Sequence, residues 1–265
     1  MLRFILLGLV GAGCVLAQPN SARAKKVIDD AVAALGGQAF LNMQDRVEAG
    51  RGYSFYRENL SGLSRLKIYT RYLVRPEPPQ PGFIGVRERQ AQGPKEDVAI
   101  LFTEEGGWET TYRGAKPMQD ALLKRWRESL LHNVLYILRM RLGEPGLVFD
   151  SLGADVFENQ PVDIVNIADA DNRQVKVLIH QTTHLPVRQE WQRRDPLTKE
   201  LVSEVTVFTK WRDVGGGVQW PFVLRRERNG LRISEIYSES VEINKGLTDQ
   251  LFTLSGDVKI LDKKK

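Results

Sequence analysis

The chain has 265 residues, of which 42% are hydrophobic and 27% charged, so it can build a substantial core. Its formal net charge of +5 is spread along the chain among acidic residues, apart from the terminal LDKKK. A nucleic-acid binder concentrates its basic residues in one patch, so we expect no nucleic-acid partner. Weak peripheral contact with an anionic membrane surface fits the charge better.

Residues 1–17 have the pattern of a secretory signal. Arg3 precedes the apolar run FILLGLVGAGCVLA, and the polar QPNSARAKK follows it. An apolar run of about fourteen residues is short for a membrane-spanning helix and suits a cleaved signal peptide. We expect cleavage after Ala17, export to the periplasm, and a single domain over 18–265 with a basic tail at about 256–265. An uncleaved N-terminal anchor is the alternative.

Cys14 is the only cysteine of the chain. Its GAGC setting leaves open an outer-membrane lipoprotein anchored through Cys14. Gly11 stands where such a signal wants a larger aliphatic residue, and the apolar run continues after the cysteine, which favours the cleaved signal. The mature chain would then contain no cysteine and no disulfide, which suits a bacterial periplasm better than a eukaryotic extracellular space.

The first elements after the signal are a helix and two strands. Apolar residues recur at helical spacing over 27–35, and Gly36-Gly37 ends the helix. The period then changes to two, which indicates a sheet with one apolar face. The residues expected on that face are Val47, Ala49, Tyr53 and Phe55 in one strand and Leu66, Ile68, Tyr72 and Val74 in the next.

The rest of the chain is one helical stretch among strands. Four prolines make 75–82 a loop, and 98–112 is a hairpin turned at EEGG. A helix of about six turns is predicted over 118–142, with a wide apolar face that must lie against a sheet. From residue 155 onward, strands joined by short turns predict an up-and-down meander.

The stretch HQTTHLPVRQEW (180–191) contains two of the three histidines. On a strand, His180 and His184 would lie about 13 Å apart, too far to share a metal ion, so we interpret the stretch as a strand corner. The chain has no catalytic motif, and the acidic pair Asp169/Asp171 falls in a turn, where solvated carboxylates are the default. We therefore expect no enzyme, no metal and no cofactor.

Two long stretches resemble one family. ENQPVDIVNIADADNRQVKVLIHQTTHLPVRQEWQ (158–192) is similar to the LolA/LolB-like superfamily of outer-membrane lipoprotein carriers, with its strand, acidic turn, strand and T-x-L-P-V-R corner. WRDVGGGVQWPFVLRRERNGLRISEIYSESVEINKGLTDQLF (211–252) continues the pattern, and AVAALGGQAFLNM (31–43) resembles the way such proteins begin. The resemblance implies a mainly β fold with helices (α+β), an unclosed antiparallel β-barrel wrapped round an N-terminal helix and a central helix.

That fold implies an apolar cavity between the sheet and the 118–142 helix, able to bind lipid acyl chains, including those of lipoproteins. The expectation is a periplasmic carrier that releases its ligand when the helix shifts. An envelope sensor that binds a protein partner on the same concave sheet is the alternative, and an enzyme is the third class. The candidate lining residues are Tyr53, Phe55, Ile68, Tyr72, Trp126, Leu130, Val134, Trp220 and Phe222.

Overall fold

The computed structural model describes residues 20–195, 197–254 and 256–261, and the predicted signal and Cys14 lie outside this part. Its strands form one antiparallel sheet in the order β6-β5-β4-β3-β2-β1-β13-β12-β11-β10-β9-β8-β7. Neighbours in the sheet are therefore neighbours in the chain, except where β1 pairs with β13. The strands are β1 (Asp45–Tyr56), β2 (Asn59–Tyr72), β3 (Val86–Gln92), β4 (Val98–Phe102), β5 (Gly107–Thr111), β6 (Gly114–Pro117), β7 (Val148–Phe157), β8 (Gln160–Ala168), β9 (Gln174–His180), β10 (Pro186–Arg194), β11 (Leu201–Asp213), β12 (Gln219–Arg228) and β13 (Leu231–Ile243).

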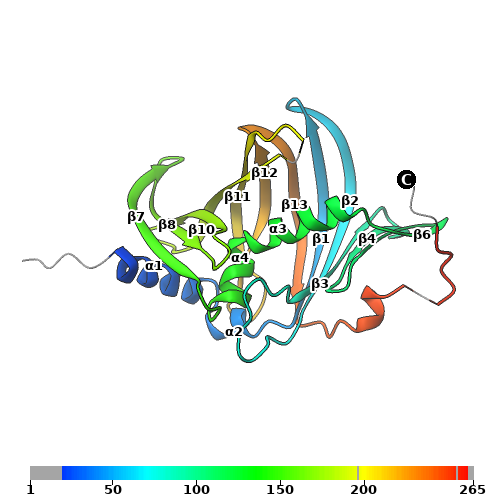
Figure 1. Cartoon of the computed structure of the whole chain (residues 1–265), viewed down its shortest axis with the longest axis horizontal. Helices are drawn as coiled ribbons and strands as arrows, with labels where there is room; N and C mark the ends of the chain where they lie inside the picture. Colours follow the sequence, from blue (N-terminus) through cyan, green and yellow to red (C-terminus); the bar gives the residue numbers. More distant parts are fainter. Residues whose placement is uncertain (1–19, 196, 255, 262–265) are drawn as a thin grey trace, which may run out of the picture.

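The sheet curves round the helices (Figure 1) and stays open, because its edge strands β6 and β7 do not pair with each other. The meander and the hairpin predicted from the sequence are confirmed. The predicted apolar face is correct for Leu66, Ile68 and Tyr72 of β2, but Val74 lies beyond that strand and is exposed, and the face predicted for β1 is wrong. The helical segments are α1 (Asn20–Ala34), α2 (Gln38–Leu41), α3 (Asp120–Leu131), α4 (Val134–Tyr136), the π-helix η1 (Ile137–Arg141) and the 3-10 helix η2 (Asp249–Phe252).

The main core lies between α1, α2, α4 and η1 on one side and strands β8–β12 on the other. α1 packs against β7 and β8, as its predicted apolar stripe requires. Phe40, Leu138 and Phe208 are at most 1% exposed, which places them at the centre of this core. Burial of these side chains removes apolar surface from water, which is the main favourable term in folding.

The single helix predicted over 118–142 is wrong, because the segment breaks at Asn133. Asn133 has an extended backbone, and its side-chain oxygen accepts hydrogen bonds from the backbone N–H groups of Leu135 (2.9 Å) and Tyr136 (3.2 Å). Gln189 of β10 accepts a third, from Val134 N–H, at 2.8 Å. These acceptors satisfy the orphan donors of a new helix start, so the chain begins α4 in a new direction.

A buried ion network fixes the end of η1 to the β8–β9 turn. Arg141, which is 3% exposed, donates to Glu144 at 2.6 Å and to Asp169 at 2.7 Å. Asp169 also accepts from Arg173 Nη1 at 2.7 Å. Burial raises the pKa of Asp169, but the hydrogen bonds from the two arginines outweigh it and hold that pKa below its usual range. The expectation of a solvated carboxylate at Asp169 is therefore wrong.

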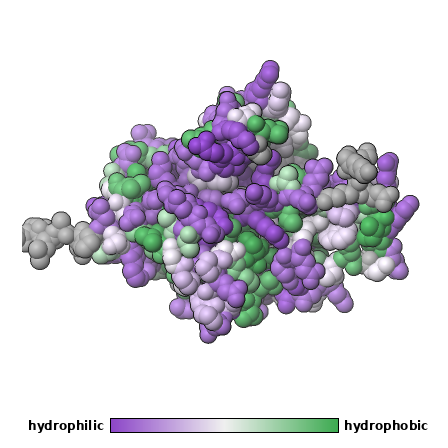
Figure 2. All heavy atoms as spheres, in the orientation of Figure 1, coloured by the Kyte–Doolittle hydropathy of each residue, from purple (hydrophilic) through white to green (hydrophobic). Residues whose placement is uncertain are grey.

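The face of the molecule that Figure 2 shows is mainly polar. Figure 2 shows charged and polar side chains covering the viewed face, with hydrophobic ones scattered among them.

The C-terminal segment adjoins the edge strand β6, where Leu261 N–H donates to the carbonyl of Ala115 at 2.7 Å. Within the described ranges, no helix is both long and apolar enough to cross a membrane.

Candidate functional site: a groove beneath α3

A groove separates α3 from the concave face of the sheet. It consists of a compartment of about 340 Å³ and an inner compartment of about 170 Å³, which adjoin because six residues line both. In Figure 1, α3 crosses in front of the strands that form the groove's back. The shared lining residues are Glu88, Gln90, Leu130, Asn133, Thr206 and Arg226. The larger compartment, at about 340 Å³, lies at the lower end of the range of volumes for small-molecule pockets.

One wall of the groove comes from α3 and strands β2–β4 and is mainly apolar, although β3 contributes Glu88 and Gln90 to it and α3 contributes Arg125 and Ser129. Trp126 of α3 stacks on Phe102 of β4 with a centroid distance of 4.4 Å and an interplanar angle of 5°, which holds the helix against the sheet. Arg127 adds a hydrogen bond of 3.1 Å to the carbonyl of Glu104. The apolar side chains of this wall are Leu66, Ile68, Ile100, Phe102, Met118, Leu122, Trp126 and Leu130.

The opposite wall is charged and comes from β10–β12. Glu204 accepts hydrogen bonds from Arg193 (3.0 Å) and Arg228 (2.9 Å), so two arginines share one carboxylate. Arg226 lies on the same face, as its place in both compartments shows. The groove is therefore amphipathic across its width.

Its floor contains a buried polar cluster round Arg46. This guanidinium lies 4.2 Å from the ring centre of Trp220, donates to Thr70 at 3.0 Å and forms an ion pair with Glu48, which in turn accepts from Ser238. Burial lowers the pKa of Arg46, but Glu48 and Tyr72 outweigh this effect and raise it above its ordinary value. Arg46 therefore stays charged, and the floor offers hydrogen bonds where a purely apolar cavity would offer none.

Five of the nine predicted lining residues line the groove. They are Ile68, Tyr72, Trp126, Leu130 and Trp220. Val134 and Phe222 lie in the main core instead, because the break at Asn133 turns Val134 towards the sheet and Phe222 packs among core residues.

Tyr53 and Phe55 lie on the other face of the sheet, contrary to the prediction. Ile68, which lines the groove, pairs directly with Glu48, so the even-numbered positions of β1 face inward. Tyr53 instead contacts Tyr237 edge to face at 5.4 Å, and Arg232 covers the ring of Phe55 at 3.9 Å. The apolar positions of β1 thus face outward, because the inner ones contain the Arg46–Glu48 pair.

The charged groove residues were missed, although the strand period signals them. Arg226 and Arg228 continue the two-residue spacing that begins at Trp220 and Leu224, and Thr206 lies opposite Arg226 on β11. Apolar residues alone defined the predicted inner face, which left these positions out.

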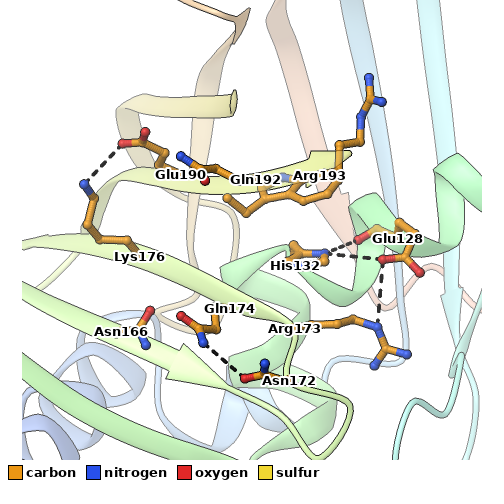
Figure 3. Close-up of a pocket in the computed structure, with 11 residues that line it drawn as sticks. Glu128, His132, Asn166, Asn172, Arg173, Gln174, Lys176, Glu190, Gln192 and Arg193 are labelled. Atoms are coloured by element: carbon orange, nitrogen blue, oxygen red, sulfur yellow. Dashed lines mark hydrogen bonds and ion pairs between the residues drawn. The ribbon is translucent and has the colours of Figure 1, made fainter. Parts of the chain in front are cut away.

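A polar pocket opens beside the groove and shares Trp191 and Arg193 with it (Figure 3). His132, at the end of α3, stacks on Trp191 with ring centres 4.1 Å apart, and its Nδ1 donates to the carbonyl of Glu128 at 2.7 Å. The cations here are already paired: Lys176 with Glu190 at 3.3 Å, and Arg173 with Glu128 at 3.8 Å.

The interpretation of HQTTHLPVRQEW as a strand corner is confirmed. His180 ends β9, and its Nδ1 accepts from the backbone N–H groups of Thr182 and Thr183, each at 3.1 Å. His184 has a positive φ of 56° and donates its backbone N–H to the carbonyl of His180 at 2.8 Å, which closes the turn before β10. No group of three potential metal ligands occurs in the part of the chain that the structure describes.

Neither a protein-family model nor a curated protein matches the sequence. Three solved structures resemble the fold. A protein domain from Vibrio parahaemolyticus, provisionally named an outer membrane lipoprotein-sorting protein, has a TM-score of 0.57 at 12% identity, over 88% of this chain and 97% of that one. A DUF1329 family protein from Desulfovibrio piger has 0.58 at 12%, over 87% and 97%.

A LolA superfamily protein from Nitrosomonas europaea has a TM-score of 0.53 at 14% identity, over 87% of this chain and 97% of that one. These identities establish similarity of fold alone. The open sheet, its strand order and the helices on its concave side agree with the architecture that the sequence predicted. This chain therefore has the LolA-like fold.

Proposed function

We propose that this protein is a periplasmic carrier or binding protein that holds a lipid acyl chain, such as that of a lipoprotein, in the groove beneath α3. The observation that carries the proposal is the mainly apolar wall of that groove, where Ile68, Trp126 and Leu130 line compartments of about 170 and 340 Å³. Each methylene group that leaves water there contributes about 0.8 kcal/mol.

The attachment of α3 supports release as well as binding. Leu131 is its only buried residue, and the Trp126–Phe102 stack and the Arg127 hydrogen bond join it to the sheet. A helix with so few buried groups opens at a smaller cost in free energy than a core element does. We therefore infer that α3 moves away from the sheet when the ligand enters or leaves.

Native mass spectrometry of protein purified from a bacterial envelope tests the proposal. Ser129 of α3 lines the groove, so Ser129→Trp should fill it without removing a core contact. We expect an adduct with the mass of an acyl lipid on the unaltered protein and none on this variant. Lys124→Trp is the matched control, because Lys124 lies on α3 outside both compartments of the groove and should leave the adduct in place. An empty wild-type protein, or equal adducts on both variants, would contradict the proposal.

A further inference from the structure

One guanidinium on the charged wall of the groove has no carboxylate partner. Arg226 is exposed, and it forms no ion pair with any described residue. Its neighbours on the same face are engaged: Arg193 and Arg228 bind Glu204, and Arg46 binds Glu48. On the charged wall, Arg226 is therefore the position that presents a positive charge without an ion pair to a described residue. The groove is also lined by Arg125 of α3, in the outer compartment, and by Glu88 of β3, which accepts a hydrogen bond from Gln90 at 2.6 Å.

Two hydroxyl-bearing residues flank Arg226 on the neighbouring strands, and Thr206 also lines both compartments of the groove. Thr206 of β11 and Ser234 of β13 are the direct cross-strand partners of Arg226, and directly opposed residues of antiparallel strands point to the same face. Neither side-chain hydroxyl makes a hydrogen bond to a residue in the described ranges. The row from Thr206 through Arg226 to Ser234 thus offers a planar cation and two free donors, which suits an anionic oxygen group.

Apolar side chains adjoin this row. Leu224 and Ile236 lie two positions along β12 and β13 and pair with each other, and both line the inner compartment together with Arg226. Leu130 of α3 lines the same two compartments as Arg226. An anion bound at Arg226 would therefore have apolar surface beside it, and a hydrocarbon chain attached to it could lie along α3.

We propose that the ligand of the groove is an anionic amphiphile with a single acyl chain, whose carboxylate or phosphate head group binds Arg226 between Thr206 and Ser234. This inference rests on the proposed function, since it takes the acyl chain to lie in the groove. It adds that the ligand is negatively charged and that Arg226 binds its head group. Arg226 is a specificity-determining residue in this scheme, and the apolar wall discriminates poorly between chains.

Titration calorimetry with three amphiphiles of equal chain length tests the inference: dodecyl phosphate and dodecanoate, each below its micelle concentration, and dodecanol below its solubility limit. Because Arg226 is exposed, we expect the anions to bind about fivefold more tightly than the alcohol, with the preference falling as salt rises. Arg226→Gln should lower the affinity for the two anions about fivefold, to near that for dodecanol, and so remove the preference. The phosphate and carboxylate arms identify which head group is preferred.

Arg225→Gln is the matched control. Arg225 is the next residue of β12, and its Nε pairs with Glu227 at 2.8 Å outside the groove, so the preference for anions should survive its replacement. Equal binding of all three amphiphiles by the wild type, or equal losses for alcohol and anions in Arg226→Gln, would overturn the inference and leave the acyl-chain proposal standing. Failure of all three to bind would instead count against the proposed function itself.

Discussion

The two halves of the segment after β6 have similar sequences and opposite roles. Both α3 and the α4–η1 segment carry apolar residues at helical spacing, which is why one helix was predicted. In α3 only Leu131 is buried, whereas every residue of α4 and η1 is buried. α3 therefore covers a groove, whereas α4 and η1 pack against the sheet as part of the core.

This difference comes from what each half meets. α4 and η1 enter the part of the concave face where Val165, Val177 and Phe208 point inward, and the two surfaces pack into one core. α3 covers the groove instead, where Arg46 of β1, Glu204 of β11 and Arg226 of β12 occupy the inner face. Charged side chains cannot be sealed under an apolar helix without a large desolvation cost, so the groove stays open there.

Truncation of one leucine in each half should separate stability from binding, and it is the largest effect we expect. Leu138→Ala removes a fully buried side chain and should lower the free energy of unfolding by about 2–5 kcal/mol, without changing dodecanol affinity. Leu130→Ala, in the groove, should cost about 1 kcal/mol and weaken dodecanol binding at least about threefold. Urea unfolding and calorimetry measure the two quantities. If both substitutions changed the free energy of unfolding and the dodecanol affinity by equal amounts, α3 and the α4–η1 segment would not differ in role.

Most of the fold could be predicted, because strand period and turn residues are local signals. The alternation in 63–74 placed Ile68 and Tyr72 on the inner face, and the RNG turn placed β12 beside β13. The break at Asn133 was missed although asparagine is a weak helix former and a strong N-cap. The third acceptor at that break, Gln189, comes from β10, and local sequence does not reveal such a distant partner.

Asn133→Ala should therefore test how firmly the two halves are separated. It removes the acceptor for Leu135 and Tyr136 N–H at the start of α4, and we expect a loss of about 1 kcal/mol in the free energy of unfolding. Asn133→Asp, which keeps a capping oxygen, should restore most of it. If alanine instead left stability unchanged or increased it, the segment would prefer a continuous helix, and the cap would not be what divides α3 from α4.

The site was predictable only in part, because the pairing of charges depends on strands that are distant in sequence. Val47 and Ala49 are apolar and alternate with Arg46 and Glu48, so the sequence alone predicts that the odd-numbered positions of β1 face inward. In the structure Arg46 and Glu48 face inward instead. What stabilises them inside is Thr70 from β2, Trp220 from β12 and Ser238 from β13. A polar residue on the inner face is therefore tolerated only where three separate strands supply its partners, and a single strand does not contain that information.

The smallest effect we expect concerns His132, which lies at the junction of the two halves. His132 is 4% exposed, and its ring stacks on Trp191 of β10. Burial lowers the pKa of His132 below the ordinary 6.5 and outweighs the backbone carbonyl and carboxylate of Glu128, which favour the charged form.

The unfolded chain then binds a proton at higher pH than the folded protein does, so stability falls as pH drops below about 6.5 and stops falling below the lower, folded pKa. His132→Phe keeps an aromatic ring on Trp191 and removes the titration. Between pH 7.5 and 5.5, the wild type should lose about 1–2 °C more in melting temperature than this variant. Other groups titrate in both proteins, so only this difference reports on His132. An equal loss would mean that the junction opens enough to hydrate the imidazole, and α3 and α4 would then share one mobile hinge.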